Sequence, residues 1–344
     1  MGAVLGAWLL LLAACGPPAT AVVGPTPAAV VQTAPPRPAG SATPSATAPA
    51  TPAPSVAAPP SPTSIQTALP PNTAAPTTPP TATAPPPTFT PPPPPPSLAG
   101  EHLLWPRPVP LASQMWTDKS YPYGSTRGGA LRPHTGVEFG VGAGTPVLAV
   151  APGTVVAAGN DAQLAYGPQT DFYGNLVIVE LEGGAPTFVL YGHLSEVSVA
   201  VGQTVAAGDV LGLSGATGVA DGPHLHFEVR VGANDYSATR NPLLWLVPLP
   251  QTGVVAGRVV SPSGELLHEA PITLRRVDAP AAYTATTSYA LGEPNSDGID
   301  ENFAVDDVVG GFYEVIVDNG RRRFTTELWV YPGRINWVEL VVGP

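Results

Sequence analysis

The sequence predicts an all-β protein, in which an antiparallel β-sheet domain is followed by a small β-sandwich. From about Gly100 onward, short apolar runs alternate with glycine, proline or asparagine, as in TPVLAVAPGTVVAAG and NLVIVELEGG. Runs of about four to eight residues with such boundaries are typical of strands joined by turns. The same region shows no sustained helical repeat of apolar residues, which argues against helices. We therefore expect strands throughout the folded part of the chain.

Composition divides the 344 residues into regions of different character. Residues 16–99 alternate Pro, Ala, Thr and Ser, and Arg37 is the one charged residue among them. Such a segment cannot bury enough apolar surface to offset the entropy lost on folding, so we expect a disordered tether. Two β domains follow, at residues 100–250 and 251–344. The second contains about seven short strand-like runs, which favours a β-sandwich.

Residues 1–15, MGAVLGAWLLLLAAC, form an apolar segment ahead of the tether. The segment is shorter than the roughly 20 apolar residues that span a bilayer, and it ends in small residues, which is typical of a signal peptide. Residues Leu12 to Cys15 resemble the lipobox of bacterial lipoproteins. This resemblance implies a lipid on Cys15, and a place on the outer side of the cytoplasmic membrane or in the cell envelope. No Lys or Arg precedes the apolar segment, which departs from the pattern, and a plain secretory signal is the alternative.

The chain is acidic, with a formal net charge of −11 and a single lysine, Lys119. Nucleic-acid binding relies on Lys and Arg side chains that neutralise phosphates, so we expect no nucleic-acid partner. The same charge disfavours adsorption to an anionic membrane, and membrane attachment would depend on the lipid. Cys15 is the only cysteine, so no disulfide within the chain is expected.

Two histidines stand one residue apart in GPHLHFEVR, at His224 and His226. Side chains at positions i and i+2 of a strand point to the same face, so these two imidazoles are expected side by side. His193 in LYGHLS lies on another predicted strand, and His134 in PHTGVEF stands four residues before Glu138. Histidine nitrogens and a carboxylate are the ligands that zinc binds in catalytic sites. The sequence therefore predicts a metal site built from these residues.

One feature of the spacing requires a change in chain direction. On a straight strand, His134 and Glu138 would stand about 13 Å apart, which is too far to share one ion. Gly136 lies between them and permits a bend. We therefore expect the chain to turn between the two residues.

The segments HTGVEF, GTPVLAVAPGTV, YGHLS and SGATGVADGPHLHFEVR resemble the lysostaphin and LytM type of zinc metallopeptidase. The resemblance runs from about Tyr121 to Leu246. It implies a β-sheet core, and an endopeptidase that cuts peptide cross-links of bacterial peptidoglycan with a zinc-activated water. The implied substrate is thus peptidoglycan, and the bond that is cut within it stays open.

The resemblance also implies a role for each site residue. His134, Glu138 and His226 would hold Zn²⁺, while His193 and His224 would bind or deprotonate the water and steady the oxyanion. Glu138 stands where the family has aspartate, and its carboxylate lies one methylene further from the backbone. Relatives that have lost motif residues act as binding modules for other cell-wall hydrolases. A catalytically degenerate regulator of such hydrolases is therefore the alternative function.

The second domain, residues 251–344, resembles carboxypeptidase regulatory-like sandwiches in GRVVSPSGELLHEAPITLRR and SDGIDENFAVDDVVGGFYEVIV. Its acidic stretch EPNSDGIDEN could bind calcium through Asp297, Asp300 and Glu301, but it lacks the regular spacing of a known calcium loop. A solvated turn is the simpler expectation. The sequence does not decide whether this sandwich binds glycan, positions the first domain or only spaces it.

Overall fold

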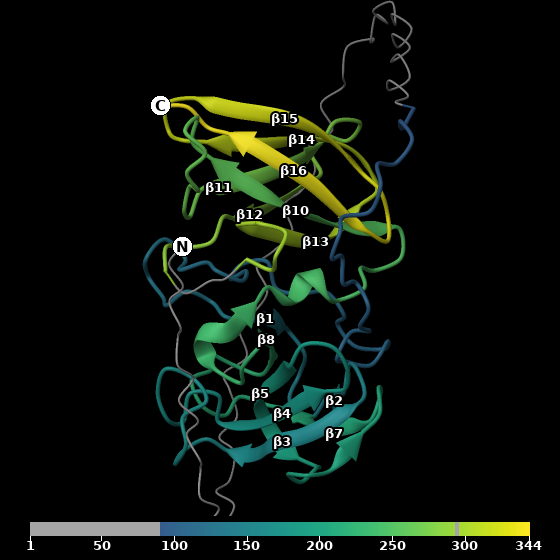
Figure 1. Ribbon diagram of the computed structural model, residues 1–344, viewed down its shortest axis with the longest axis vertical. Helices are drawn as coiled ribbons and strands as arrows, with labels where there is room; N and C mark the ends of the chain where they lie inside the picture. Colours follow the sequence, from purple (N-terminus) through teal and green to yellow (C-terminus); the bar gives the residue numbers. More distant parts are fainter. Residues whose placement is uncertain (1–89, 293–295) are drawn as a thin grey trace, which may run out of the picture. The chain divides into compact units, whose positions relative to one another are not determined.

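The computed structural model describes residues 90–292 and 296–344 (Figure 1). The predicted signal peptide, the lipidation at Cys15 and most of the tether lie outside these residues. All described residues belong to one compact unit, Pro80–Pro344. Within the described ranges, no helix has the length and apolar character needed to cross a bilayer.

The first part of the described chain forms a nine-stranded sheet in which every strand pairing is antiparallel. Its main path runs β1-β8-β5-β4-β3-β6, with β2, β7 and β9 at its sides. The strands are β1 (Val137–Phe139), β2 (Pro146–Leu148), β3 (Gly153–Asn160), β4 (Asn175–Leu181), β5 (Thr187–Val197), β6 (Thr204–Val205), β7 (Val210–Ser214), β8 (Leu225–Val231) and β9 (Thr239–Arg240). Short 3-10 turns occur at η1 (Tyr236–Ala238) and η2 (Pro242–Leu244).

The remaining strands form two smaller sheets, one of three strands in the order β13-β10-β16 and one of four in the order β12-β11-β14-β15. The strands are β10 (Thr252–Val260), β11 (Pro271–Arg276), β12 (Tyr283–Thr287), β13 (Phe303–Val309), β14 (Gly311–Asp318), β15 (Arg323–Val330) and β16 (Ile335–Val341). Side chains of both sheets share one apolar cluster, which includes Val255, Leu274, Val315 and Val338. Two sheets packed on a common core make a β-sandwich, and the predicted all-β fold class is confirmed.

Continuous runs of buried residues on the central strands β4, β5 and β8 form the core of the nine-stranded sheet. Val177, Val189 and Phe227 are fully buried and belong to one apolar cluster. On β8, all residues from Leu225 to Arg230 are buried, because the strand lies between β1 and β5 and is covered on both faces. A strand in this central position holds its side chains rigidly, which suits a site that needs fixed geometry.

Candidate metal centre

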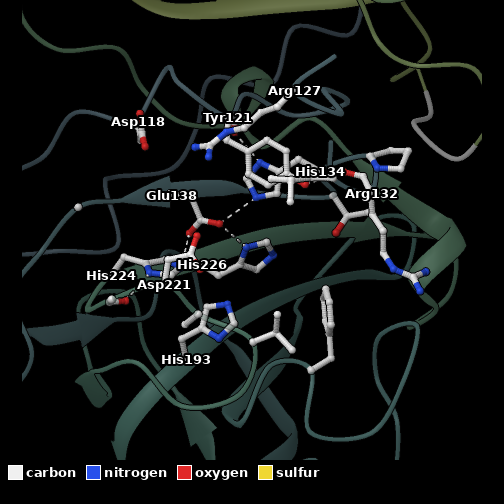
Figure 2. A pocket seen from close by; sticks show the side chains of 18 of the residues that line it. Asp118, Tyr121, Arg127, Arg132, His134, Glu138, His193, Asp221, His224 and His226 are labelled. Carbon is white, nitrogen blue, oxygen red and sulfur yellow. Dashed lines mark hydrogen bonds and ion pairs between the residues drawn. The ribbon is translucent and has the colours of Figure 1, made fainter. Parts of the chain in front are cut away.

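The register of β8 brings the predicted site residues together. His226 on β8 pairs with Glu138 on one neighbouring strand, β1, and with Gly192 on the other, β5. His193 therefore lies next to the same point of the sheet, and His224 stands just before β8. Figure 2 shows Glu138 among His134, His224 and His226, with His193 nearby. All five residues predicted from the sequence thus lie in one site.

Glu138 is the centre of the proposed ligand set. Its Oε1 lies 2.9 Å from Nε2 of His134 and 3.0 Å from Nδ1 of His226. One candidate ligand atom from each of the three residues lies within 4.8 Å of the others. Ligand atoms bound to one tetrahedral zinc at about 2.0–2.2 Å stand roughly 3.3–3.6 Å apart. The three donors are therefore close to the spacing that a zinc ion requires.

Gly136 is needed here for a reason that the sequence does not reveal. The chain bends between His134 and Glu138, since their side chains meet at 2.9 Å. A Cβ at position 136 would lie 2.6 Å from the carbonyl oxygen of Phe227 and 2.7 Å from Nε2 of His226. Glycine therefore gives space for the His226 ring as well as for the turn of the chain.

Hydrogen bonds to backbone carbonyls fix the orientation of two imidazoles. Nδ1 of His134 lies 2.6 Å from the carbonyl oxygen of Tyr121, and Nδ1 of His224 lies 2.8 Å from that of Gly222. A carbonyl oxygen only accepts, so each Nδ1 carries the proton. When the His134 ring is neutral, the lone pair of its Nε2 then faces Oε1 of Glu138 at 2.9 Å, and a cation between them would remove this repulsion. Burial lowers the pKa of His224, but the Glu138 carboxylate, 3.0 Å from its Nε2, outweighs burial and raises this pKa, which favours a proton on Nε2.

Two buried polar atoms at the site are also unsatisfied. Among the described residues, neither Oε2 of Glu138 nor Nε2 of His226 has a hydrogen-bond partner. His224 stands at ion-pair distance from that Oε2, but without hydrogen-bond alignment. Buried polar atoms without partners are rare and often mark a missing ion or water. The donor chemistry and the unsatisfied Oε2 of Glu138 together fit a bound metal ion, whereas Nε2 of His226 belongs to a ring whose other nitrogen, Nδ1, faces Glu138.

The electrostatic environment separates Glu138 from His193. Burial raises the pKa of Glu138, but the charge of His226 and the contacts with the other histidines outweigh it and hold this pKa well below its usual range. Burial lowers the pKa of His193 to about 4. Glu138 is therefore a carboxylate anion, and His193 is a neutral imidazole at neutral pH.

An irregularity in the pairing of β5 with β4 holds His193 in an uncommon backbone conformation. His193 has a φ of 60°, which few residues other than glycine adopt. Its amide donates to the carbonyl oxygen of Tyr173 at 2.9 Å, and its Nδ1 donates to that of Thr217 at 2.8 Å. Gly174 and Gly218 lie so close together that a Cβ on either would come within 2.4 Å of the other's backbone nitrogen. This packing explains why position 218, the last residue of SGATG, is a glycine. Because Nδ1 of His193 is bonded to Thr217, Nε2 is the ring nitrogen with a free lone pair.

A pocket of about 780 Å³ opens beside the five residues. Tyr121 forms part of its wall and stacks on the His134 ring, with centroids 4.2 Å apart and an interplanar angle of 6°. The side chains that line the rest of the pocket come from loops and from the 3-10 turn η1, and they include Arg127, Leu131, Arg132, Phe172 and Tyr236. Sequence reasoning missed all of them, because loop residues of this kind carry no spacing pattern.

A buried ion pair below the site was also missed. Glu228 and Arg230 on β8 are both fully buried, and Nη2 of Arg230 lies 2.8 Å from Oε2 of Glu228. The hydroxyl of Tyr173 donates to the same carboxylate at 2.9 Å, and the Tyr173 ring lies 5.5 Å from that of His226. The alternation in HLHFEVR could have indicated this arrangement, since it places both charged residues on the face that carries the two histidines.

Replacing Glu228 with alanine is expected to lower the free energy of unfolding by about 3–5 kcal/mol, because it leaves the buried Arg230 without its counter-charge. Urea unfolding of the full chain, followed by tyrosine and tryptophan fluorescence, measures this loss. The matched control is Glu339→Ala, which breaks the half-exposed pair with Arg258 and should cost about 1 kcal/mol or less. Equal losses in the two variants would contradict the structural role of the buried pair.

Comparison with known proteins shows which proteins this part of the chain is similar to. Residues 132–238 match the model of peptidase family M23. An uncharacterized metalloprotease of Haemophilus influenzae is 39% identical over 128 residues, which are 37% of this chain and 24% of the relative. The peptidoglycan DD-endopeptidase ShyA of Vibrio cholerae is 36% identical over 110 residues, 32% of this chain and 23% of the relative. This chain therefore spans about a quarter of the length of these curated relatives.

A solved structure gives a match over most of its own length. The catalytic domain of lysostaphin from Staphylococcus simulans is 34% identical, and the match covers 37% of this chain and 86% of that domain, with a TM-score of 0.30. The matched residues of this chain include His134, Glu138, His193, His224 and His226. Residues 132–238 of this chain are therefore similar to peptidase family M23.

Proposed function

We propose that the protein is a zinc metalloendopeptidase that hydrolyses peptide cross-links of bacterial peptidoglycan. The observation that carries this proposal is the meeting of His134, Glu138 and His226 at one point beside a pocket of about 780 Å³. Similarity to peptidase family M23 supports a peptidase, and the name of the Vibrio cholerae relative, a peptidoglycan DD-endopeptidase, supports peptidoglycan as the substrate.

Each residue would have a separate task in this reaction. His134, Glu138 and His226 would hold the metal, which when bound supplies a Lewis acid that polarises a carbonyl and acidifies water. Nε2 of His193 would accept a proton from the attacking water, because Nδ1 of the same ring is engaged with the carbonyl oxygen of Thr217. His224, protonated on Nε2, would donate to the oxygen of the scissile carbonyl as negative charge develops there. The pocket would orient the peptide and exclude water.

The second candidate is a degenerate module that binds and regulates other cell-wall hydrolases. Glu138 in place of the family aspartate favours it, because a misplacement of about 1 Å can lower a rate on the order of a hundredfold. Against it, the longer side chain does reach both histidines, at 2.9 and 3.0 Å. The extra methylene therefore does not prevent the ligand set from assembling.

Metal removal tests the proposal. We expect the purified full chain to contain close to one zinc per molecule and to release soluble muropeptides from purified sacculi. A chelator should abolish this release, and added zinc should restore it. A zinc-loaded chain that releases nothing would favour the regulator, and a chain that binds no zinc would contradict both the metal site and the peptidase.

Attachment to the cell envelope through a lipid on Cys15 is part of the same proposal. It rests on the lipobox-like residues Leu12 to Cys15, which precede the described part of the chain. The tether predicted from the sequence at residues 16–99 would join this lipid to the peptidase domain.

A further inference from the structure

One wall of the pocket is a single stretch of chain, residues 117–134, which we call the pocket segment. Its members that line the pocket are Asp118, Tyr121, Arg127, Ala130, Leu131, Arg132, Pro133 and His134. The segment also supports two of the three proposed ligands. Tyr121 accepts the hydrogen bond from Nδ1 of His134 at 2.6 Å, and the amide of Asp118 donates to the carbonyl oxygen of Glu138 at 2.8 Å. The position of this segment therefore decides how His134 and Glu138 are held.

The sandwich holds the start of the pocket segment through Asp306 on β13. This carboxylate is fully buried, and its Oδ1 accepts from the hydroxyl of Thr117 at 2.8 Å and from Nζ of Lys119 at 3.0 Å. Its Oδ2 accepts from Nη1 of Arg107 at 2.8 Å. Burial opposes ionisation, but the charges of Lys119 and Arg107 keep the pKa of Asp306 below its usual range, so the group is an anion. Thr117 and Lys119 flank Asp118, the residue that bonds to Glu138.

A second contact lies in the middle of the segment, at Gly124. The amide of Ala290 donates to the carbonyl oxygen of Gly124 at 2.8 Å, and the amide of Gly124 donates to that of His134 at 2.7 Å. The ring of Tyr289 lies against Gly124, where an added Cβ would come within 2.6 Å of it. A short chain of hydrogen bonds thus connects the sandwich to the backbone of a proposed metal ligand.

A third contact lies two residues further on, at Thr126. Its amide donates to Oε1 of Glu269 at 3.0 Å, and its hydroxyl donates to the same oxygen. Glu269 lies between β10 and β11 of the sandwich and does not line the pocket. The segment is therefore fastened at its start, middle and later part by side chains or backbone of the sandwich.

We propose that the C-terminal sandwich is a positioning element of the metal site, which acts by holding the pocket segment against His134 and Glu138. The inference rests on the proposed zinc site, and it assigns the sandwich a task that neither glycan binding nor spacing would require. Asp306 and Glu269 are then positioning residues, since they contact the supports of the ligands and never the ligands themselves. Hydrogen-bond partners that orient metal ligands typically contribute about 10–100-fold to metal affinity.

Neighbouring aspartates on β13 provide a matched pair of variants for the test. Asp306 bonds to Thr117 and Lys119 of the pocket segment, whereas Asp307 bonds to Arg107 at 2.8 Å and to the amide of Leu249 at 3.0 Å, both outside the segment. Asp306→Asn and Asp307→Asn each remove one of the two carboxylates that pair with Arg107. Both variants therefore weaken the contact between the sandwich and the peptidase domain. Only the first should loosen the pocket segment.

The experiment measures zinc affinity of the full chain by competition with a chromophoric chelator, at a temperature where all variants are folded. Asp306→Asn should bind zinc up to about tenfold more weakly than wild type, at the lower end of the range for direct partners of the ligands because Asp306 acts through residues 117–119, and Asp307→Asn should stay within about twofold. In the metal-free chain, the amides of residues 117–134 should exchange hydrogen faster in Asp306→Asn alone, and the imidazole NMR signal of His134 should shift. If Asp306→Asn does not fold, Glu269→Gln is measured instead and should change the same quantities in the same direction.

The outcomes separate this inference from the proposed function. Equal zinc affinities and equal exchange rates in the two aspartate variants would overturn the positioning role, while zinc binding by wild type would leave the peptidase proposal intact. A wild type that binds no zinc would contradict the proposed function. The exchange and NMR measurements on the metal-free chain would still decide whether the sandwich holds the segment.

Discussion

Replacing Glu138 with alanine is expected to abolish zinc binding and peptidoglycan hydrolysis together. Oε1 of Glu138 is the atom on which His134 and His226 converge, at 2.9 and 3.0 Å, and its carboxylate is the only charged member of the ligand set. Without it, two imidazoles remain, which do not complete the three protein ligands of a catalytic zinc site. Zinc content by atomic absorption and muropeptide release from sacculi measure the two losses.

Glu138→Asp is the informative companion to this variant. It restores the family residue, so we expect zinc to be kept and activity to be similar to wild type or higher. The matched control is Glu180→Ala, which removes an exposed carboxylate on β4 and should change neither property. Full zinc occupancy in Glu138→Ala would contradict the ligand assignment. A zinc-loaded wild type that is inactive, and stays inactive as Glu138→Asp, would favour the regulator.

Much of this site could be predicted because β-strands have a simple side-chain period. The period of two placed His224 and His226 on one face, and in the structure both stand within about 3 Å of the Glu138 carboxylate. The same period would have placed Glu228 and Arg230 on that face, where they form a buried ion pair. The same strand pattern therefore predicts the buried ion pair beside the site as well as the two histidines.

Pairing between distant strands could not be predicted in the same way. The parallel pairing of β10 with β16 joins the first and last strands of the sandwich, as in Val254 opposite Ile335. The apolar alternation of each strand is satisfied by any partner that covers the same face, so the sequence of one strand does not identify its neighbour. The fold class was predictable, and this connection was not.

The contacts that hold the pocket segment were hidden for a related reason. Asp306, Glu269 and Tyr289 lie more than 130 residues after the segment residues that they contact, as the hydrogen bonds of Asp306 to Thr117 and Glu269 to Thr126 show. No local pattern marks a carboxylate that will be buried against a distant loop. Their role emerges only from packing, where a buried anion must find partners.

His193→Ala and His224→Ala are expected to keep zinc while turnover falls by about 10²–10⁴-fold in each, the usual effect of losing a general acid or base. Neither residue belongs to the set of three donors that meet within 4.8 Å, so removing either leaves the metal ligands in place. The rings of the two histidines are only 4.8 Å apart, so they flank the same point of the pocket. Single-turnover rates on muropeptides, measured beside zinc content, separate this effect from a loss of metal.

His102→Ala is the matched control, since its imidazole pairs with Asp297 and takes no part in lining the pocket. It should keep both zinc and turnover. The double variant at His193 and His224 adds a further test, because two groups that act in one step lose less together than the product of their separate effects. A wild-type rate in either single variant would remove that histidine from the reaction. Zinc loss in His193→Ala or His224→Ala would instead indicate that the replaced histidine is a metal ligand. That result would contradict its assignment as a general acid or base.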